Sequence, residues 1–234
     1  MTPLKVIISG GFNGAYDQLV PEFERTHGVK IATGSGASQG TGPQTIAAQL
    51  ARGVEADVVI LSREGLTELI AARRIVAGTD ADLALAPIGV AVRAGTPKPD
   101  VSTVEGFRQA LLAAKTIAVP GSTSGIWLRA ELFPRLGIAD RINVEVRPRG
   151  TDATAMLAAG DADLGVLPTS EIVYARGVAF AGNIAPEIQF IQTFSAAIVE
   201  GSRQIETAKR LIAYLTSTQA AEAIRKSGMQ LPAG

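Results

Sequence analysis

The sequence predicts an α/β fold with two lobes, and three observations carry that prediction. Short apolar runs alternate along the chain with segments of helical periodicity, which is typical of mainly parallel sheets covered by helices. Two longer extended runs, at 83–94 and 189–199, interrupt this alternation. The chain has 234 residues, of which 47% are hydrophobic and 19% charged, so it can bury one large core or two small ones.

The first lobe is expected to take residues 1–84 and 195–234, with the C-terminal helices returning to it. Apolar runs predict its strands, and recurrence of apolar residues at helical spacing predicts its helices. Glycine caps helix ends, so His27-Gly28 is expected to end the first helix. The predicted strands are 6–9, 29–33 and 57–61, and the predicted helices are 14–27, 44–52, 64–72, 204–215 and 219–226.

The second lobe is expected to take residues 85–194, and the ligand cleft is expected between the lobes. A capping residue at 102 or 103 favours a helix that starts there. The two long extended runs join the lobes. The predicted strands are 116–119, 143–147 and 164–167, and the predicted helices are 103–113, 126–136 and 153–159.

Composition excludes several classes of function. Lys+Arg and Asp+Glu both number 22, so no basic excess exists to follow a nucleic-acid backbone. Cysteine is absent and His27 is the single histidine, which excludes thiol chemistry, cysteine zinc sites and any site that needs two histidines. No cofactor and no metal are therefore expected. No apolar run reaches 18 residues, so no membrane insertion is expected.

The turns that follow the strands carry the strongest functional indication. Four of them are rich in Gly, Ser and Thr and open helices, starting at Ser9, Gly34, Gly121 and Gly150. The first turn of a helix has unsatisfied N–H groups and the positive end of the dipole, and small residues let an anion approach them. Several such turns at the carboxyl ends of strands predict a site for a small anion.

Five segments resemble periplasmic molybdate-binding proteins, and more broadly the type II solute-binding fold. They are Ser9-Gly10-Gly11, Gly53–Ile60, Ser122–Ile126, Leu164-Gly165-Val166 and Thr218–Ala221. The resemblance extends from about residue 4 to residue 231. It implies two lobes, joined by two crossing strands, that close over an anion. It also implies an ABC transporter permease as partner if the protein is exported. The compartment stays open: periplasmic if a leader is removed, otherwise cytoplasmic.

The resemblance places family ligand positions on this sequence only in part. The first-turn serine falls on Gly11, with Ser9 two positions away, and the second serine falls on Ser35 or Ser38. The tyrosine that donates a phenol falls on Pro168, which has neither a phenol nor an N–H. These departures favour a ligand other than molybdate or tungstate.

A small organic carboxylate is the favoured ligand, because arginines that suit bidentate carboxylate binding stand at predicted strand ends. The backbone donors of the family fall on Ser124 and near Gly150. The predicted ligand-binding residues are Ser9, Gly10, Gly11, Ser35, Ser38, Arg63, Ser122, Ser124, Gly125, Arg147, Arg149, Gly150, Thr151 and Thr169.

Three functions stay open. The leading one is reversible capture of a small anion, an organic polycarboxylate, by hinge closure. The alternative is a cofactor-free isomerase of a small unsaturated polycarboxylate, because aconitate isomerases resemble the same fold family. In that case Ser9 and Ser124 hold the substrate, and Asp152 or Glu171 moves the proton. Asp152 and Glu171 also suit an ordinary first helical turn. The third function is molybdate or tungstate binding.

Overall fold

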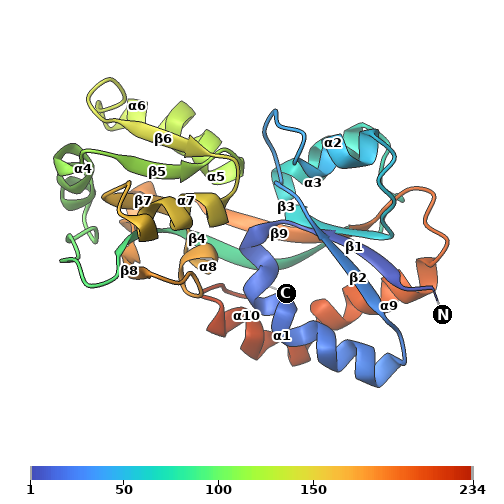
Figure 1. Cartoon of the computed structure of the whole chain (residues 1–234). Helices are drawn as coiled ribbons and strands as arrows, with labels where there is room; N and C mark the ends of the chain where they lie inside the picture. Colours follow the sequence, from blue (N-terminus) through green and yellow to red (C-terminus); the bar gives the residue numbers. More distant parts are fainter. Residues whose placement is uncertain (1, 233–234) are drawn as a thin grey trace. The chain divides into compact units, whose positions relative to one another are not determined.

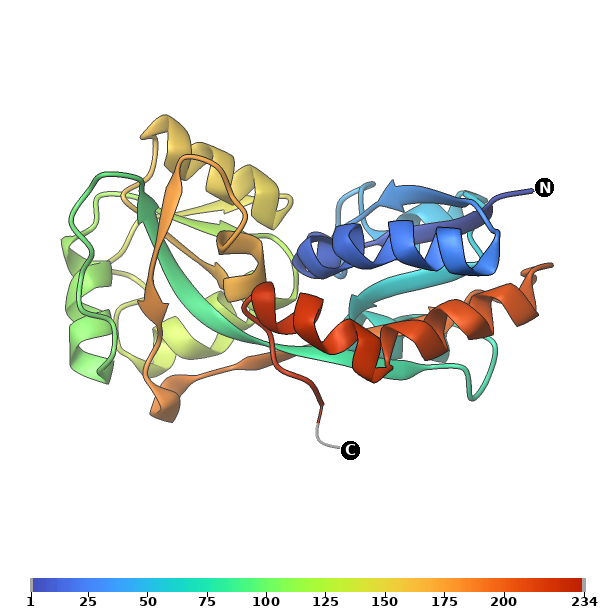
Figure 2. The same cartoon turned by 90° about the horizontal axis from the view of Figure 1, so that it is seen from below.

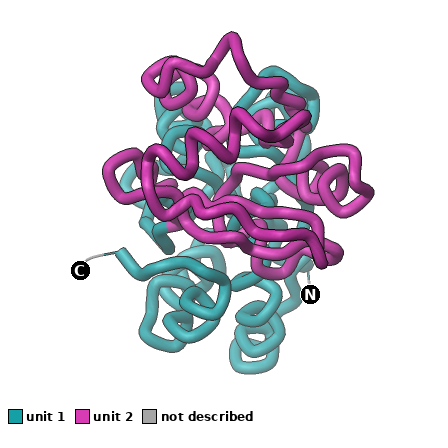
Figure 3. The backbone as a smooth tube through the Cα atoms, turned by 90° about the vertical axis from the view of Figure 1, so that its left-hand side faces the viewer, with its two compact units in different colours: residues 1–85, 193–234 teal, residues 86–192 magenta. Residues whose placement is uncertain are grey.

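The computed structural model describes residues 2–232, which form a mixed α/β fold (Figure 1). The chain divides into two compact units (Figure 3). Unit 1 comprises the residues up to Leu85 together with those from Thr193 onward, and unit 2 is Ala86–Gln192. Strands β4 (Ala81–Arg93) and β9 (Ile191–Ile198) each begin in one unit and end in the other. The chain thus crosses between the units twice, along the two long extended runs that the sequence predicted.

The sheet of unit 1 has the strand order β2-β1-β3-β9. Its parallel strands are β1 (Leu4–Ile8), β2 (Ile31–Ser35) and β3 (Val58–Ser62), and β9 runs antiparallel to β3. Every residue of β3 is buried, as expected for a strand in the middle of a covered sheet. The helices are α1 (Gly10–His27), α2 (Ile46–Ala51), α3 (Arg63–Ala71), α9 (Ile205–Leu215) and α10 (Ala221–Lys226), with a 3₁₀ turn at Thr218–Ala220. Figure 2 shows α1 beside α9 and α10.

The sheet of unit 2 has the order β4-β7-β5-β6, and β8 pairs with β4. Strands β5 (Ile117–Pro120), β6 (Val144–Arg147) and β7 (Leu164–Pro168) are parallel to one another, whereas β4 runs antiparallel to both β7 and β8 (Val178–Asn183). The α-helices are α4 (Val104–Ala113), α5 (Thr123–Trp127), α6 (Phe133–Arg135), α7 (Gly150–Ala159) and α8 (Thr169–Ile172). A π-helical turn, Leu128–Leu132, joins α5 to α6, and a 3₁₀ turn covers Pro186–Ile188.

Two glycines allow close packing at the starts of helices. A Cβ on Gly11 would lie 2.1 Å from Cζ of Phe194, so the ring of Phe194 fills the space of a side chain there. A Cβ on Gly125 would lie 1.6 Å from the carbonyl oxygen of Pro120, so α5 approaches the end of β5 too closely for any side chain. Both glycines are explained by packing within their own unit.

Several predicted boundaries differ from the observed ones. Helix α1 begins at Gly10 rather than at residue 14, because Ser9 already has extended backbone angles and acts as its N-cap. Helix α7 likewise begins at Gly150 rather than 153. The predicted helix 126–136 is two α-helical pieces on either side of the π-helical turn. Among residues 2–232, no helix combines the length and the apolar character that crossing a membrane requires.

Candidate functional site

The carboxyl ends of β5, β6 and β7 meet at one edge of the unit 2 sheet, because the three strands are parallel. Each strand leads into a helix at this edge, α5, α7 and α8 respectively (Figure 1). The turn after β5 is tied to the end of β6, since the N–H of Gly121 donates to the carbonyl oxygen of Arg147 at 2.5 Å. Helix α7 contacts α8. The turns that the sequence singled out in this unit are therefore neighbours.

The carboxyl group of Glu171 lies against Gly150, the first residue of α7. A Cβ on Gly150 would lie 1.4 Å from Oε2 of Glu171, so the carboxyl occupies the space that a side chain would need. Oε2 is inaccessible to solvent and has no hydrogen-bond partner among residues 2–232. Glu171 belongs to α8 and is half-buried as a residue, and its Oε2 atom is fully enclosed.

Burial raises the pKa of the Glu171 carboxyl from its ordinary 4.5 to about 7. The cause is loss of hydration, which destabilises the charged form. A carboxyl with a pKa near neutral pH exchanges protons readily in both directions there, which general acid–base chemistry requires. Buried carboxyl oxygens normally have partners, so an unpartnered one at a turn of this kind indicates a functional role.

The other predicted residues of this edge differ in what they can offer. Ser124 lies in α5 and is only 2% exposed, whereas Thr151 is exposed in the first turn of α7. Ser122 is the N-cap residue of α5. The hydroxyl of Thr169 donates to Oδ1 of Asn183 at 2.7 Å, which joins α8 to β8. The Thr169 proton is thus already used inside the unit.

The two predicted arginines of this edge are not equivalent. Arg149 forms an ion pair with Asp152 at 2.9 Å, and its backbone N–H donates to the Asp152 carboxylate at 3.1 Å. This hydrogen bonding with Arg149 lowers the pKa of Asp152, which therefore caps α7 as an ionised group. Asp152 does not have the properties of a proton carrier. Arg147, by contrast, is exposed at the end of β6, and no hydrogen bond or ion pair of its guanidinium is found within residues 2–232.

Unit 1 has its own group of predicted residues at the carboxyl end of β1. Ser9 is 4% exposed, its N–H donates to the carbonyl oxygen of Ile60 at 2.8 Å, and its Oγ has no partner among residues 2–232. Gly10 and Gly11 form the first turn of the 18-residue helix α1. A hydroxyl that caps no backbone N–H at the start of a long helix remains available to an anion.

The alternatives Ser35 and Ser38 differ in their surroundings. Ser35 is the exposed last residue of β2. Ser38 is 4% exposed, and its Oγ accepts a hydrogen bond from the N–H of Ser62 at 2.9 Å. Ser38 therefore holds the turn between β3 and α3, and its hydroxyl proton remains to be donated.

Arg63 is held by acidic residues of unit 1. Its guanidinium forms ion pairs with Asp80, at 2.7 Å, and with Asp82. Partial burial would raise the pKa of Asp82, but the hydrogen bond from Ser195 and the pair with Arg63 together lower it. The charge of Arg63 is thus compensated, and the expectation that it binds a ligand carboxylate has no geometric support.

Replacing Arg63 with methionine is expected to lower the free energy of unfolding by roughly 1 kcal/mol. Two partly exposed ion pairs are lost, and such pairs contribute about 0.2–1 kcal/mol each. Urea unfolding measures the loss, with Arg176→Met as the control, because Arg176 is exposed and forms no ion pair within residues 2–232. Equal stability of the Arg63→Met variant and the parent would show that the ion pairs contribute nothing.

Three buried polar groups were not predicted from the sequence. Oε2 of Glu64, Oγ of Ser170 and Oε1 of Gln192 are enclosed without a hydrogen-bond partner among residues 2–232. Ser170 precedes Glu171 in α8, so the polar run after β7 was a signal for it. Gln192 lies in β9, and no pattern in the sequence distinguishes it from other strand residues.

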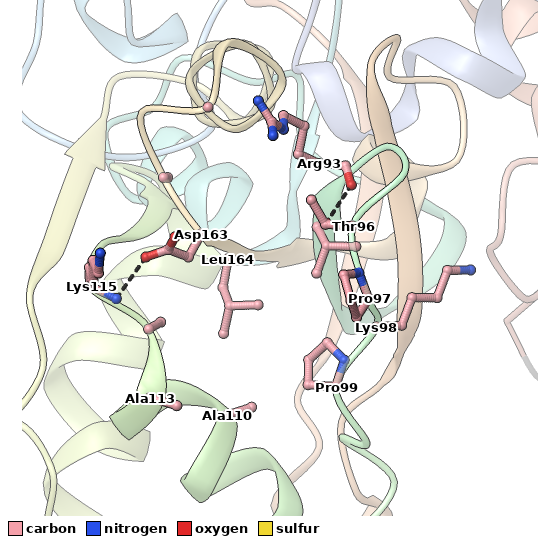
Figure 4. A pocket seen from close by; sticks show the side chains of 14 residues that line it. Arg93, Thr96, Pro97, Lys98, Pro99, Ala110, Ala113, Lys115, Asp163 and Leu164 are labelled. Carbon is pink, nitrogen blue, oxygen red and sulfur yellow. Dashed lines mark hydrogen bonds between the residues drawn. The ribbon is translucent and has the colours of Figure 1, made fainter.

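A cavity of about 510 Å³ lies elsewhere in unit 2 (Figure 4). Its walls come from the loop after β4, including Pro97 and Pro99, and from Ala110 and Ala113 of α4. Lys115 and Leu164, which stand where β5 and β7 begin, line the other side, so the cavity is at the opposite end of these strands from Ser124. Within residues 2–232, no group of three or more His, Asp or Glu side chains is arranged to hold a metal ion.

Comparison with known proteins gives one curated relative of high similarity. The chain is 35% identical over 231 residues to an aconitate isomerase from a Pseudomonas species, which covers 98% of this chain and 88% of the relative. Among solved structures, the Azotobacter vinelandii periplasmic molybdate-binding protein has a TM-score of 0.76 at 21% identity, over 98% of this chain and 100% of that one. A sulfate-binding protein from Mycobacterium tuberculosis has a TM-score of 0.78 at 20% identity, over 99% and 88% of the two chains.

These solved structures are type II periplasmic binding proteins, so the predicted fold class is confirmed. The family model for bacterial extracellular solute-binding proteins matches residues 4–230. That range takes in both units and both crossing strands. The chain therefore belongs to the bacterial extracellular solute-binding protein family.

Proposed function

We propose that this protein isomerises a small unsaturated tricarboxylate of the aconitate class without a cofactor. The observation that carries the proposal is the enclosed, unpartnered Glu171 carboxyl beside Gly150, with a pKa of about 7. An acid that is half ionised at neutral pH is suited to taking up and returning a proton, which capture of an anion alone does not require. The substrate class comes from the relative at 35% identity.

The reaction is a proton shift along three carbons, and Glu171 is the residue assigned to it. Its carboxylate takes a proton from the methylene next to the double bond, and the electron pair delocalises into the conjugated carboxylate as a dienolate. The same carboxyl returns the proton to the far carbon of the former double bond. One C–H bond breaks, one forms and the double bond moves, with no change of oxidation state. Helix N–H groups at the start of α7 stabilise the developing charge.

Binding of the substrate carboxylates is assigned to groups of the same edge. Arg147 has an exposed guanidinium with no hydrogen bond or ion pair among residues 2–232, although its charge helps to lower the pKa of Asp152, and such a guanidinium suits bidentate carboxylate binding. Ser124 and Ser170 are buried hydroxyl groups in the helices that follow β5 and β7. A cation and neutral donors together hold a polycarboxylate in its ionised form.

Reversible capture of a polycarboxylate without conversion is the second candidate. The family model, which describes extracellular solute-binding proteins and matches residues 4–230, favours it. The enclosed Glu171 would then donate a hydrogen bond to a bound carboxylate in its protonated form. Both candidates place a small polycarboxylate at this edge, and only chemical conversion separates them.

The test is to follow the ultraviolet absorbance of cis- and trans-aconitate with the purified protein, without added metal or nucleotide. We expect each isomer to be converted to the same equilibrium mixture. A thermal-shift series with citrate, cis-aconitate, trans-aconitate, molybdate and sulfate runs beside it, because a bound ligand raises the unfolding temperature with concentration. Stabilisation by a tricarboxylate without conversion would establish the second candidate, and stabilisation by molybdate alone would contradict both.

Replacing Gly150 with alanine is expected to abolish conversion while the protein still folds. The new Cβ would stand where Oε2 of Glu171 lies, and the carboxyl, at the end of a flexible side chain, is what moves away. We expect kcat to fall by about 10²-fold or more, since a displaced base no longer reaches the substrate. Gly42→Ala is the matched control, because a Cβ there meets nothing closer than 4.0 Å. Full activity in Gly150→Ala would remove Glu171 from the mechanism.

A further inference from the structure

A polar groove of about 1040 Å³ lies in unit 1, away from Ser9. It is lined where β1, β2 and β3 begin, whereas Ser9 follows the carboxyl end of β1. The remaining walls are the loop between α3 and β4, the loop between β9 and α9, and the first turns of α9. The groove is thus at the opposite edge of the sheet from the predicted anion site of unit 1.

Cations outnumber acids along this groove. The lining cations are Lys5, Lys30, Arg73, Arg74, Arg203 and Arg210, and the lining acids are Glu55, Asp57 and Glu200. Lys5 pairs with Glu55, and Lys30 pairs with Glu24 at 3.1 Å. No hydrogen bond or ion pair within residues 2–232 involves the guanidinium groups of Arg73, Arg74 or Arg203. Arg73 and Arg74 are exposed and present positive charge that the described part of the unit does not neutralise. Arg203 is also exposed, but it lies close enough to Glu55 to help Lys5 lower the pKa of that carboxyl.

Arg73 has an unfavourable backbone conformation. Its φ is 55°, and it is the one non-glycine residue with positive φ in the described chain. It follows the end of α3, where the N–H of Arg74 donates to the carbonyl oxygen of Leu69 at 2.9 Å, and glycine or asparagine is the usual residue at such a position. Glycine would adopt this backbone conformation at lower cost, so we infer that the arginine side chain at position 73 has a role of its own.

Hydrogen bonds hold the backbones of the two loops that carry the arginines. Asp57 is 7% exposed and accepts hydrogen bonds from the N–H of Lys5 at 2.8 Å and from the hydroxyl of Ser202 at 2.6 Å. The N–H of Glu200 donates to the carbonyl oxygen of Arg74 at 2.8 Å, which joins the two arginine-bearing loops. The backbones of the two loops that carry the arginines are therefore fixed before any partner arrives, which reduces the entropy lost on binding.

We propose that this groove binds an extended acidic segment of a partner protein. Its volume is at the upper limit of small-molecule pockets, so a chain fits it better than a single small anion. The six lining cations come from several elements and outnumber the three lining acids, which matches carboxylates spaced along a chain. Nucleic acid is disfavoured, because His27 is the one aromatic ring among the lining residues and no platform for base stacking exists there.

The experiment measures fluorescence anisotropy of a labelled decaglutamate peptide with the whole protein at low and at physiological salt. We expect saturable binding that weakens as salt rises. The variant Arg73→Gly/Arg74→Ser/Arg203→Ser is expected to weaken binding at least about tenfold. The control variant Arg135→Ser/Arg141→Ser/Arg176→Ser removes the same charge from exposed positions of unit 2 and is expected to leave binding within about twofold.

Arg73→Gly alone separates a binding role from a structural one. It relieves the backbone strain, so we expect a higher urea midpoint together with weaker peptide binding. Unchanged binding in the triple variant, or equal weakening in the control, would overturn the proposal. So would equally tight binding of tripolyphosphate or of labelled decathymidylate, because the groove would then accept any polyanion. Aconitate conversion is expected to be unchanged in all these variants, so this proposal and the proposed function fail independently.

Discussion

Replacing Glu171 with glutamine is expected to lower kcat for aconitate isomerisation by about 10²–10⁴-fold. Glutamine has the size of the protonated carboxyl and fills the same space beside Gly150, but it cannot take a proton. Because the neutral shape is kept, we expect the Kd for a tricarboxylate to change by less than about threefold. Absorbance kinetics measure kcat, and isothermal titration with citrate measures binding.

Glu145→Gln is the control for this substitution. Glu145 is an exposed acid of β6 in the same unit. Replacing it with glutamine therefore removes one carboxylate and leaves the turn at Gly150 unchanged. If the parent protein isomerises aconitate as proposed, its kcat/KM rises with pH through about 7, because the ionised carboxyl starts the reaction. A Glu171→Gln variant with the parent's kcat would place the proton transfer elsewhere.

The second large effect is on the pH dependence of stability. The folded-state pKa of Glu171, about 7, is above the ordinary value of 4.5 for an unfolded chain. The stability that follows from this shift is fully present below about pH 4.5 and is lost as the pH rises through 7. Each tenfold change in proton affinity corresponds to about 1.4 kcal/mol, so the loss amounts to about 3 kcal/mol.

Glu171→Gln removes this pH dependence, since glutamine stays neutral. We expect the difference in unfolding free energy between the variant and the parent to rise by about 3 kcal/mol, in favour of the variant, between pH 4.5 and pH 9. Urea unfolding at several pH values measures it, and the comparison cancels the other titrating groups. A difference that is constant with pH would mean that the Glu171 carboxyl is hydrated in the folded protein.

The sequence predicted the strands that lie in the middle of the sheets, because a buried strand is an unbroken apolar run. The run at 57–61 became β3, whose five residues are all buried. Strand β8, Val178–Asn183, was not predicted, since most of its residues are only half-buried and its pattern is weak. Its existence depends on pairing with β4, which lies more than 80 residues earlier in the chain. Pairing at that separation leaves no local pattern.

The candidate site was predictable to the extent that it depends on turns. Ser9, Ser124 and Gly150 stand at helix starts because small and hydroxyl residues mark these positions in the sequence. The roles of charged residues were not predictable, because they depend on partners far along the chain. Arg63 is neutralised by Asp80 and Asp82, and no pattern in the sequence around Arg63 predicts these ion pairs.

The environment of Glu171 was beyond prediction for the same reason. The two residues before it, Thr169 and Ser170, are polar, so the local sequence does not indicate an enclosed setting. The enclosure arises because Gly150 lacks a side chain and α7 lies against α8. A glycine can thus determine the protonation of a carboxyl from another helix.

The path of the chain through β4 and β9 also bears on synthesis at the ribosome. Unit 2 is one uninterrupted stretch, whereas unit 1 needs its early strands and the returning β9. At roughly 5–20 residues per second, translating from the end of β3 at residue 62 to the end of β9 at residue 198 takes roughly 7–27 s. During that delay the nascent β3, in which four of five residues are apolar, has an open edge that can pair with other chains, and it is covered only after residue 198 has emerged. Newly made protein is therefore most prone to aggregate before its last strand is translated.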